Sequence, residues 1–320
     1  MTSDFRTTSK LGIVGAGGVG SAMAYAAMMR RSARNIALYD IDGSRAEAEA
    51  LDIAHSSLFA GGTPVVGSGD LGILRDSDMV VITAGARQKP GQTRLELADA
   101  NVKILSTMLP QLLEVAPDAV YMLVTNPCDV LTVVAQQISG LPADRIFSSG
   151  TVIDTSRLRL LIGQAANVAT SSVHAVIMGE HGDSEFPLWS QANIGQVPID
   201  EWVDDNGDPL FPEERRIELA EQAMKAAYRV IDGKGSTNYA IGLAGARIVE
   251  AVLGDQAAVL PVSTVLEDYR GVSGVALSVP SIVDRNGIRE RLQVPMSDEE
   301  LAKLHRSAEA LEQSMSGLRF

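Results

Sequence analysis

The sequence has little of what marks a secreted, membrane-spanning or disulfide-linked protein. Cys128 is the single cysteine among 320 residues, which excludes a disulfide framework and a cysteine zinc site, and we expect no metal. No apolar run approaches the roughly 18 residues needed to span a bilayer. The N-terminal stretch "MTSDFRTTSK" is polar and lacks the apolar core of a signal peptide. These absences predict a cytoplasmic protein without a membrane segment.

Positive charge is also scarce. The chain has 27 Lys and Arg against 40 Asp and Glu, which gives a net charge of −13. Nucleic acid is therefore an unfavourable partner, because its phosphates would be repelled on average. A small anionic substrate would need arginines placed at its binding site. With 46% hydrophobic residues the chain can bury a large core, and its length allows two domains.

The order of apolar and amphipathic segments predicts an α/β fold. Up to about residue 150, short β-rich runs alternate with helical patterns such as "SAMAYAAMMRR" and "VLTVVAQQIS". The strand candidates are "LGIVGA", "NIALYD", "MVVITAG", "AVYMLVTN" and "RIFSSG". Continuous apolar strands between helices are typical of a doubly wound parallel sheet that is covered on both faces.

The pattern changes after residue 150. A helix over "IDTSRLRLLIG" is followed by a strand-like "VHAVIMG", by shorter β runs and by a helical stretch from Pro212 to about Val230. Ser297 and Glu300 form a capping-box signal that opens a terminal helix. We therefore predict two closely packed domains, a parallel-sheet domain over residues 1–150 and an α+β domain over residues 151–320.

A glycine loop follows the first predicted strand. Gly15, Gly17 and Gly20 form G-x-G-x-x-G between "LGIV" and a helical segment. Such a loop allows a tight turn, and the helix N-terminus offers N–H groups to a pyrophosphate. Asp40 ends the next predicted strand, where its carboxylate can accept hydrogen bonds from both ribose hydroxyls. The combination predicts a Rossmann-type domain that binds NAD rather than NADP, since Asp40 would repel a 2′-phosphate; a purely structural glycine turn is the alternative.

His181 in "GEHGD" and Asp154 in "VIDTSR" are candidates for proton transfer. A lone histidine after an apolar run is most often a structural residue. However, a buried aspartate needs a partner. Paired with His181, Asp154 would orient the imidazole ring and raise its proton affinity, which would give an acid/base group usable near neutral pH. The sequence alone leaves both interpretations open.

Six segments together resemble one known family. They are "GAGGVG", "GARQKPGQTR", "VTNPCDVL", "GTVIDTSRLR", "GEHGDSEFPLWS" and "GKGSTNY", and they span essentially the whole chain. In order and spacing they resemble the lactate/malate dehydrogenase family, and within it the L-lactate branch. The resemblance implies hydride transfer between NAD and a 2-hydroxy acid, with pyruvate and L-lactate as substrates and a homo-oligomer, expected to be a tetramer, as the assembled state.

The resemblance also implies roles for individual residues. His181 would donate and accept the proton, with Asp154 as its partner, and Arg157 would clamp the substrate carboxylate. A planar guanidinium makes two parallel hydrogen bonds to a carboxylate, which lysine cannot do. Arg94 would polarise the reacting carbonyl when its loop closes and excludes water. The remaining expected site residues are Asn126 and Thr237 at the substrate, and Gly15, Gly17, Val19, Gly20, Asp40 and Asn126 at the cofactor. On its own, the Asn126–Pro127 pair would be interpreted as an ordinary turn.

Gln88 is the residue expected to select the substrate. Malate enzymes of the family resemble this segment but carry arginine before "KPG", where it pairs with a second carboxylate. Neutral Gln88 suits the methyl group of pyruvate, because an unpaired guanidinium buried against a methyl costs several kcal/mol. A one-residue shift of the loop would instead present Arg87. Malate dehydrogenase, a broader L-2-hydroxy-acid dehydrogenase and a non-catalytic NAD-binding protein therefore remain alternatives.

Arg159 and His174 are candidates for a second site. Arg157 and Arg159 are two residues apart on a predicted helix, so their side chains do not face the same way. His174 and His181 are seven residues apart, which places them on opposite faces if the strand is regular. In bacterial lactate dehydrogenases the matching arginine and histidine bind fructose 1,6-bisphosphate across a subunit dyad. The alternative is that both residues are solvated or form an ordinary interface contact.

Overall fold

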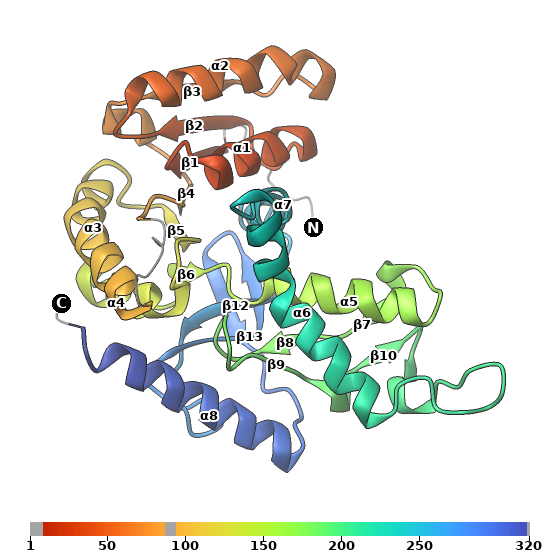
Figure 1. The fold of residues 1–320 in the computed structure, drawn as a ribbon. Coiled ribbons are helices and arrows are strands. Elements are labelled where there is room, and N and C mark those ends of the chain that lie inside the picture. The colour runs from red at the N-terminus through yellow and green to blue at the C-terminus, as the bar shows by residue number, and fades with distance from the viewer. Residues whose placement is uncertain (1–8, 87–93, 319–320) are drawn as a thin grey trace.

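The computed structural model describes residues 9–86 and 94–318, and its centre is a nine-stranded sheet (Figure 1). Six strands pair in parallel in the order β6-β5-β4-β1-β2-β3, which is the strand order of the Rossmann fold. They are β1 (Lys10–Val14), β2 (Asn35–Tyr39), β3 (Val65–Ser68), β4 (Met79–Ile82), β5 (Val120–Leu123) and β6 (Ile146–Ser148). The predicted doubly wound α/β fold is confirmed.

Helices cover both faces of the parallel strands. Side chains alternate between faces along a strand, so Ile13 packs on one side of the sheet and Val14 on the other. The Ile13 side is covered by α1 (Gly18–Arg30), α2 (Gly43–Ala60) and α7 (Tyr239–Leu253). The Val14 side is covered by α3 (Arg94–Val115) and α4 (Cys128–Ser139). The carboxyl ends of the strands lie at an edge of the sheet between the two helical layers. Ligands bind at this edge in such sheets.

The C-terminal half of the chain completes this core. Helix α7 packs beside α1, as Figure 1 shows, and three antiparallel strands continue the sheet beyond β6. These strands are β12 (Ala258–Val265), β13 (Ala276–Asp284) and β14 (Gly287–Arg291), and they join β6 through the pairing of Ser263 with Ser148. The predicted domain boundary at residue 150 falls just after β6. The division of the chain into two domains at that residue stays a prediction.

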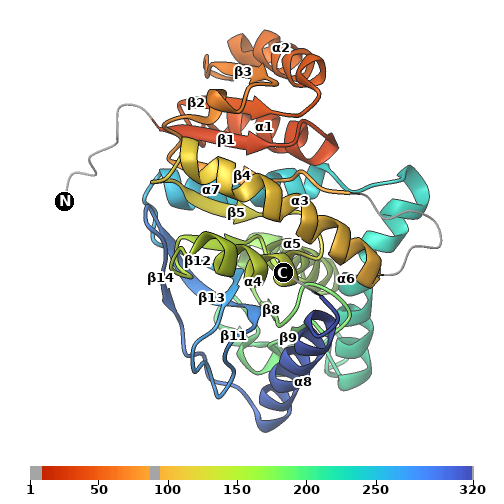
Figure 2. The same ribbon diagram turned by 90° about the vertical axis from the view of Figure 1, so that its left-hand side faces the viewer.

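The rest of the C-terminal half forms a second lobe beside these antiparallel strands (Figure 2). Its helices are α5 (Val152–Ala165), α6 (Glu213–Lys234) and α8 (Asp298–Met315), and its short strands are β7 (Val173–His174), β8 (Ile177–Met178), β9 (Phe186–Pro187), β10 (Asn193–Ile194) and β11 (Val197–Pro198). The capping box is confirmed, since Ser297 and Glu300 exchange side chain–backbone hydrogen bonds. The expectation of one strand over "VHAVIMG" was wrong: β7 and β8 are separate and pair with different partners. Within the described residues, no helix is long and apolar enough to cross a membrane.

Candidate active site

The glycine loop connects β1 to α1. Gly15 has φ +103°, and a Cβ added at Gly20 would lie 1.8 Å from the Gly15 carbonyl oxygen, so both positions require glycine. A Cβ at Gly17 would meet no described atom within 4 Å. Gly17 is also the N-cap of α1, and as a glycine it has no side chain that could cap the helix. The first N–H groups of α1 are therefore accessible to an anion.

A cleft of about 1590 Å³ opens at the carboxyl ends of the strands, in front of this loop. Most of the residues predicted for the cofactor and two predicted for the substrate pocket line it, namely Gly15, Gly17, Val19, Asp40, Asn126 and Thr237. Gly20 is not part of the lining but packs behind Gly15. Thr237 comes from the turn between α6 and α7, whose next residue, Asn238, approaches Gly18. The cleft is therefore built by both halves of the chain.

Asp40 is held at the end of β2 by backbone donors. Its Oδ2 accepts a hydrogen bond from Ala16 N at 2.7 Å, and its Oδ1 accepts one from Asp42 N at 3.0 Å. A carboxylate has about four acceptor positions, so hydroxyl groups can still be added. Arg45 also lines the cleft and donates from Nε to the Ala16 carbonyl oxygen at 2.9 Å. Sequence reasoning missed Arg45, because nothing in the local pattern links it to the glycine loop.

Asn101 is a second residue that sequence reasoning missed. It lies in α3 and is 2% exposed. Its Oδ1 accepts a hydrogen bond from Ala86 N at 2.6 Å, and its Nδ2 donates one to the Asn126 carbonyl oxygen at 2.8 Å. Asn101 therefore ties the segment that precedes residue 87 to the turn that carries Asn126. Gln88 lies outside the described residues, and Arg94 is described only as the first backbone position of α3.

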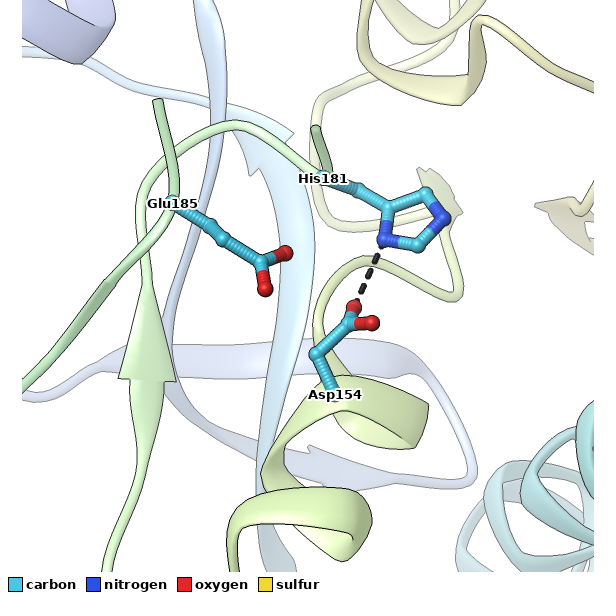
Figure 3. A group of neighbouring side chains, drawn as sticks. All are labelled: Asp154, His181 and Glu185. Carbon is cyan, nitrogen blue, oxygen red and sulfur yellow. Dashed lines mark hydrogen bonds and ion pairs between the residues drawn. The ribbon is translucent and has the colours of Figure 1, made fainter. Parts of the chain in front are cut away.

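His181, Asp154 and Arg157 meet in the second lobe (Figure 3 shows the first two). Asp154 is 1% exposed. Its Oδ2 lies 2.6 Å from His181 Nδ1, and its Oδ1 accepts a hydrogen bond from Arg157 Nη1 at 2.7 Å. The His181 side chain is 24% exposed and that of Arg157 is 17% exposed. Because Nδ1 faces the carboxylate, Nε2 is the ring nitrogen left for a ligand.

The charges of this cluster favour a protonated imidazole. Burial lowers the pKa of His181, but the charge and hydrogen bond of Asp154 outweigh burial, and the net effect raises the pKa to about 9. Burial acts to raise the pKa of Asp154, whereas His181 and Arg157 hold that pKa below its usual value. At neutral pH the pair is therefore an imidazolium beside a carboxylate. A proton is available on His181 for a developing alkoxide.

Two further acids surround His181, and sequence reasoning missed both. Asp129 in α4 is 2% exposed and accepts a hydrogen bond from His181 N at 2.7 Å. Burial raises the pKa of Asp129 to about 6. Glu185, the residue before β9, is 7% exposed, and Figure 3 shows its carboxyl group turned toward Asp154 and His181. Asp129 follows "TNP" and Glu185 follows "GEHGD", but no local pattern indicates that either residue meets His181.

The candidate second-site residues lie apart from this cluster. Arg159 donates from Nε to the Ala175 carbonyl oxygen at 2.8 Å, whereas Arg157 contacts Asp154. The two arginines of α5 therefore point to different partners, as expected. His174 is exposed on β7, next in sequence to the residue that Arg159 contacts. The parity argument for His174 does not apply, because the chain between His174 and His181 is not one regular strand.

A Rossmann-type cleft, together with a histidine–aspartate pair and a partly buried arginine, defines a nicotinamide-dependent oxidoreductase, although Asp154, Arg157 and His181 are not among the described residues that line the cleft. The chain belongs to the lactate/malate dehydrogenase family. Residues 9–148 match the family's NAD binding domain, and residues 151–318 match its alpha/beta C-terminal domain. This membership confirms the family that the sequence motifs predicted, and NAD is the cofactor.

Named relatives match this chain over nearly its full length. The chain is 51% identical to an L-lactate dehydrogenase of Bifidobacterium animalis subsp. lactis over 98% of both chains. It is 44% identical to an L-lactate dehydrogenase of Kosmotoga olearia, over 97% of this chain and 96% of the relative. Its structure superposes on the minor L-lactate dehydrogenase from Enterococcus mundtii, in a ligands-bound form, with a TM-score of 0.93 and 38% identity, covering 98% of this chain and all of that one.

The residues that line the cleft fit NAD. The open backbone at Gly17 and the uncapped start of α1 suit a pyrophosphate. Asp40, fixed by two backbone donors, presents a negative charge where a ribose with free hydroxyls is accepted and a 2′-phosphate is repelled. The cleft volume of about 1590 Å³ exceeds that of a typical small-ligand pocket, as an elongated dinucleotide requires.

Proposed function

We propose that this chain is an NAD-dependent L-lactate dehydrogenase, which reduces pyruvate to L-lactate and catalyses the reverse reaction. The observation that carries the proposal is the cluster of His181, Asp154 and Arg157, with hydrogen bonds of 2.6 and 2.7 Å around one buried carboxylate. The names of the relatives support the same activity. The proposal includes a cytoplasmic location and a role in glycolytic fermentation, where NADH is reoxidised.

In this proposal each residue of the cluster has a distinct task. Arg157 binds the substrate carboxylate with the N–H groups that Asp154 leaves available, which orients the C2 carbonyl. His181 donates its Nε2 proton to the C2 oxygen, and Asp154 stabilises the imidazolium before transfer. NAD, when bound in its reduced form, supplies the hydride for C2. Arg94 polarises the carbonyl, and Asn126 and Thr237 provide polar contacts at the edge of the pocket.

The cofactor contacts are assigned to the first lobe. Residues 1–150 form the NAD-binding unit and residues 151–320 the substrate-binding unit. The proposed cofactor residues are Gly15, Gly17, Val19, Gly20, Asp40 and Asn126. The helix start at Gly18 and the fixed carboxylate of Asp40 support this assignment. On this division, variants of His181 lose turnover but still bind NADH.

Substrate choice is assigned to Gln88, which is neutral where a malate enzyme carries arginine. The test measures NADH absorbance with pyruvate, oxaloacetate and 2-oxoisocaproate. Pyruvate should give the highest kcat/KM. A preference for oxaloacetate would assign the chain to malate and make Arg87 the selecting residue. A preference for 2-oxoisocaproate would indicate a broader hydroxy-acid dehydrogenase. NADH binding without turnover of any of the three would indicate a non-catalytic protein.

A homo-oligomer, specifically a tetramer, is part of the proposal. Helix α2 carries large apolar side chains at high exposure, Leu58 at 83% and Phe59 at 86%, and such a patch is typical of a protein interface. Light scattering after size-exclusion chromatography should give four times the 33.9 kDa chain mass. Leu58→Glu/Phe59→Glu should reduce that mass. A wild-type protein that elutes as a monomer at every concentration would contradict the proposal.

We also propose that fructose 1,6-bisphosphate activates the enzyme at Arg159 and His174. Arg159 lies against the backbone next to His174, so the two basic side chains belong to one region, with contacts other than those of the catalytic cluster. A subunit dyad through this region would bring together two copies of each. A bisphosphate would then neutralise a cluster of four cations. The corresponding experiment is the last one described in the Discussion.

A further inference from the structure

Glu185 is a buried acid that the proposed mechanism does not use. It is 7% exposed, and its Oε1 has no hydrogen-bond partner among the described residues. One carboxylate oxygen of Glu185, one of Asp154 and a ring nitrogen of His181 lie within 4.8 Å of one another (Figure 3). A buried ionised carboxylate without a partner is costly, whereas a protonated one is not. The geometry therefore favours a carboxylic acid at this position.

The charges facing Glu185 come from three elements. Asp154 and Arg157 face it from α5, His181 from the segment between β8 and β9, and Asp129 from α4. Burial raises the pKa of Glu185 to about 8, and the charge of Asp154 adds to the rise, while His181 and Arg157 oppose it. At neutral pH the side chain is therefore mostly protonated. It loses its proton in the range where His181, with a pKa of about 9, begins to lose its own.

The substrate changes this balance. With Glu185 neutral, Asp154, Asp129, Arg157 and His181 sum to zero, and the carboxylate of a 2-oxo acid adds one negative charge. With Glu185 ionised, these groups and Glu185 sum to one negative charge, and a bound carboxylate leaves two negative charges in a buried site. Ionised Glu185 and the substrate carboxylate therefore compete for the same positive charge.

We propose that Glu185 is a positioning residue that must be protonated for a 2-oxo acid to bind. Above neutral pH, substrate binding therefore takes up one proton on Glu185, in addition to the proton that His181 holds. The step is a simple protonation: a solvent proton adds to the carboxylate oxygen when the substrate anion enters. Glu185 thereby contributes, with His181, to the upper pH limit of substrate affinity. The inference rests on the proposed function, because it needs an anionic substrate at Arg157.

Among the described residues that face Glu185, no other group supplies a second proton in this range. The pKa of Asp129 is raised only to about 6, so Asp129 is ionised above neutral pH before any ligand binds. His181 and Arg157 hold the pKa of Asp154 low although burial opposes them, so Asp154 stays ionised. His181 accounts for one proton. A second proton taken up on binding therefore reports on Glu185.

The experiment measures binding of oxamate, the unreactive amide analogue of pyruvate, to the enzyme–NADH complex from pH 6.5 to 10 by NADH fluorescence. Log Kd should rise with pH with a limiting slope of about two in wild type, and of about one in the isosteric Glu185→Gln. Near pH 7 the two proteins should have Kd values within a few-fold, because both side chains are neutral there. Glu201→Gln is the matched control: it removes an exposed acid from the same lobe and should keep the slope of two.

Each outcome bears on the proposal. A wild-type slope that does not exceed one overturns it, as does the same steep slope in Glu185→Gln. If Glu185→Gln does not fold, Glu185→Met provides the same neutral volume. Should neither variant bind NADH, the wild-type slope decides the question by itself. Turnover of pyruvate at pH 7 is measured separately, so that a failure of the proposed function is distinguished from a failure of the Glu185 assignment.

Discussion

Asp129 holds His181 by its backbone: Oδ2 of Asp129 accepts a hydrogen bond from His181 N at 2.7 Å, across 52 residues of sequence. The ring of the same histidine is held by Asp154 at 2.6 Å. The two aspartates come from different helices, α4 and α5, and both are almost fully buried. His181 is therefore fixed at two points, so its Nε2 has a defined direction even though it lies in a connection between short strands.

Asp129→Asn should weaken both stability and turnover. The amide can still accept from His181 N, but its NH₂ group replaces an oxygen that has no hydrogen-bond partner among the described residues. A buried unsatisfied donor costs about 1–3 kcal/mol, which should appear as a lower urea midpoint. The kcat/KM for pyruvate should fall, while NADH affinity is retained. Asp118→Asn, an exposed change of the same chemistry, is the control. An unchanged midpoint and rate would remove Asp129 from this supporting role.

Asp154→Asn should move the pH profile toward acid. Pyruvate reduction requires protonated His181, so in wild type kcat/KM should hold at neutral pH, fall to about half near pH 9, the raised pKa of His181, and be lost above it. Lactate oxidation requires the neutral ring and should rise over the same range. Without the Asp154 charge, burial lowers the pKa of His181, and the alkaline limit for pyruvate should drop by more than one pH unit. Asp205→Asn serves as the exposed control; an unshifted limit in Asp154→Asn would show that Asp154 does not set the proton affinity.

Arg157→Lys should impair substrate binding far more than cofactor binding. Arg157 Nη1 is committed to Asp154 at 2.7 Å, so the substrate must use the other N–H groups of the fork. An ammonium group cannot hold Asp154 and grip a carboxylate with two parallel bonds. Loss of one charge-assisted hydrogen bond, about 1.5–3 kcal/mol, corresponds to roughly 10- to 150-fold in kcat/KM. Steady-state kinetics with pyruvate and a fluorescence titration with NADH separate the two effects. A near-normal KM for pyruvate would exclude Arg157 as the carboxylate clamp.

Local signals explain which parts of the fold were predictable from the sequence. The buried strands β1, β2, β4, β5 and β6 appear as continuous apolar runs, and the glycine loop is defined by neighbouring residues. Strand β3 was missed because it lies at the sheet edge and buries only Val65 completely. The split between β7 and β8 was missed because each strand has only two residues, so the apolar pattern continues across the break.

Site residues could be predicted where a short motif around the residue indicates its chemistry. The pairing of His181 with Asp154 was a hypothesis, and in the structure His181 Nδ1 lies 2.6 Å from Asp154 Oδ2. Asn101 and Asp129 were missed because their importance lies in contacts with distant segments, the Asn126 turn and the His181 backbone. Such contacts depend on how helices pack across the sheet. No periodicity or spacing in the sequence reports them.

Gln88→Arg should shift the preference from pyruvate toward oxaloacetate. Gln88 lies outside the described residues, and the prediction rests on the neutral residue before "KPG". A cation there can pair with a second carboxylate but is unpaired beside the methyl group of pyruvate. The ratio of kcat/KM for the two substrates should therefore rise in favour of oxaloacetate. Gln92→Arg adds the same charge later in the same segment and should leave the ratio unchanged. A ratio that moves equally in both variants would indicate a general charge effect.

Fructose 1,6-bisphosphate should lower the KM for pyruvate, and Arg159→Gln/His174→Gln should abolish the effect. Four cations gathered at a dyad repel one another unless an anion lies between them, so the bisphosphate should bind the assembled state and stabilise it by mass action. Substrate affinity rises if that state is also the competent one. The measurement is pyruvate saturation with and without the sugar phosphate at pH 6 and pH 8, with Arg306→Gln, an exposed change on α8, as control. A wild-type enzyme that is indifferent to the bisphosphate at both pH values would leave Arg159 and His174 as ordinary interface or surface residues.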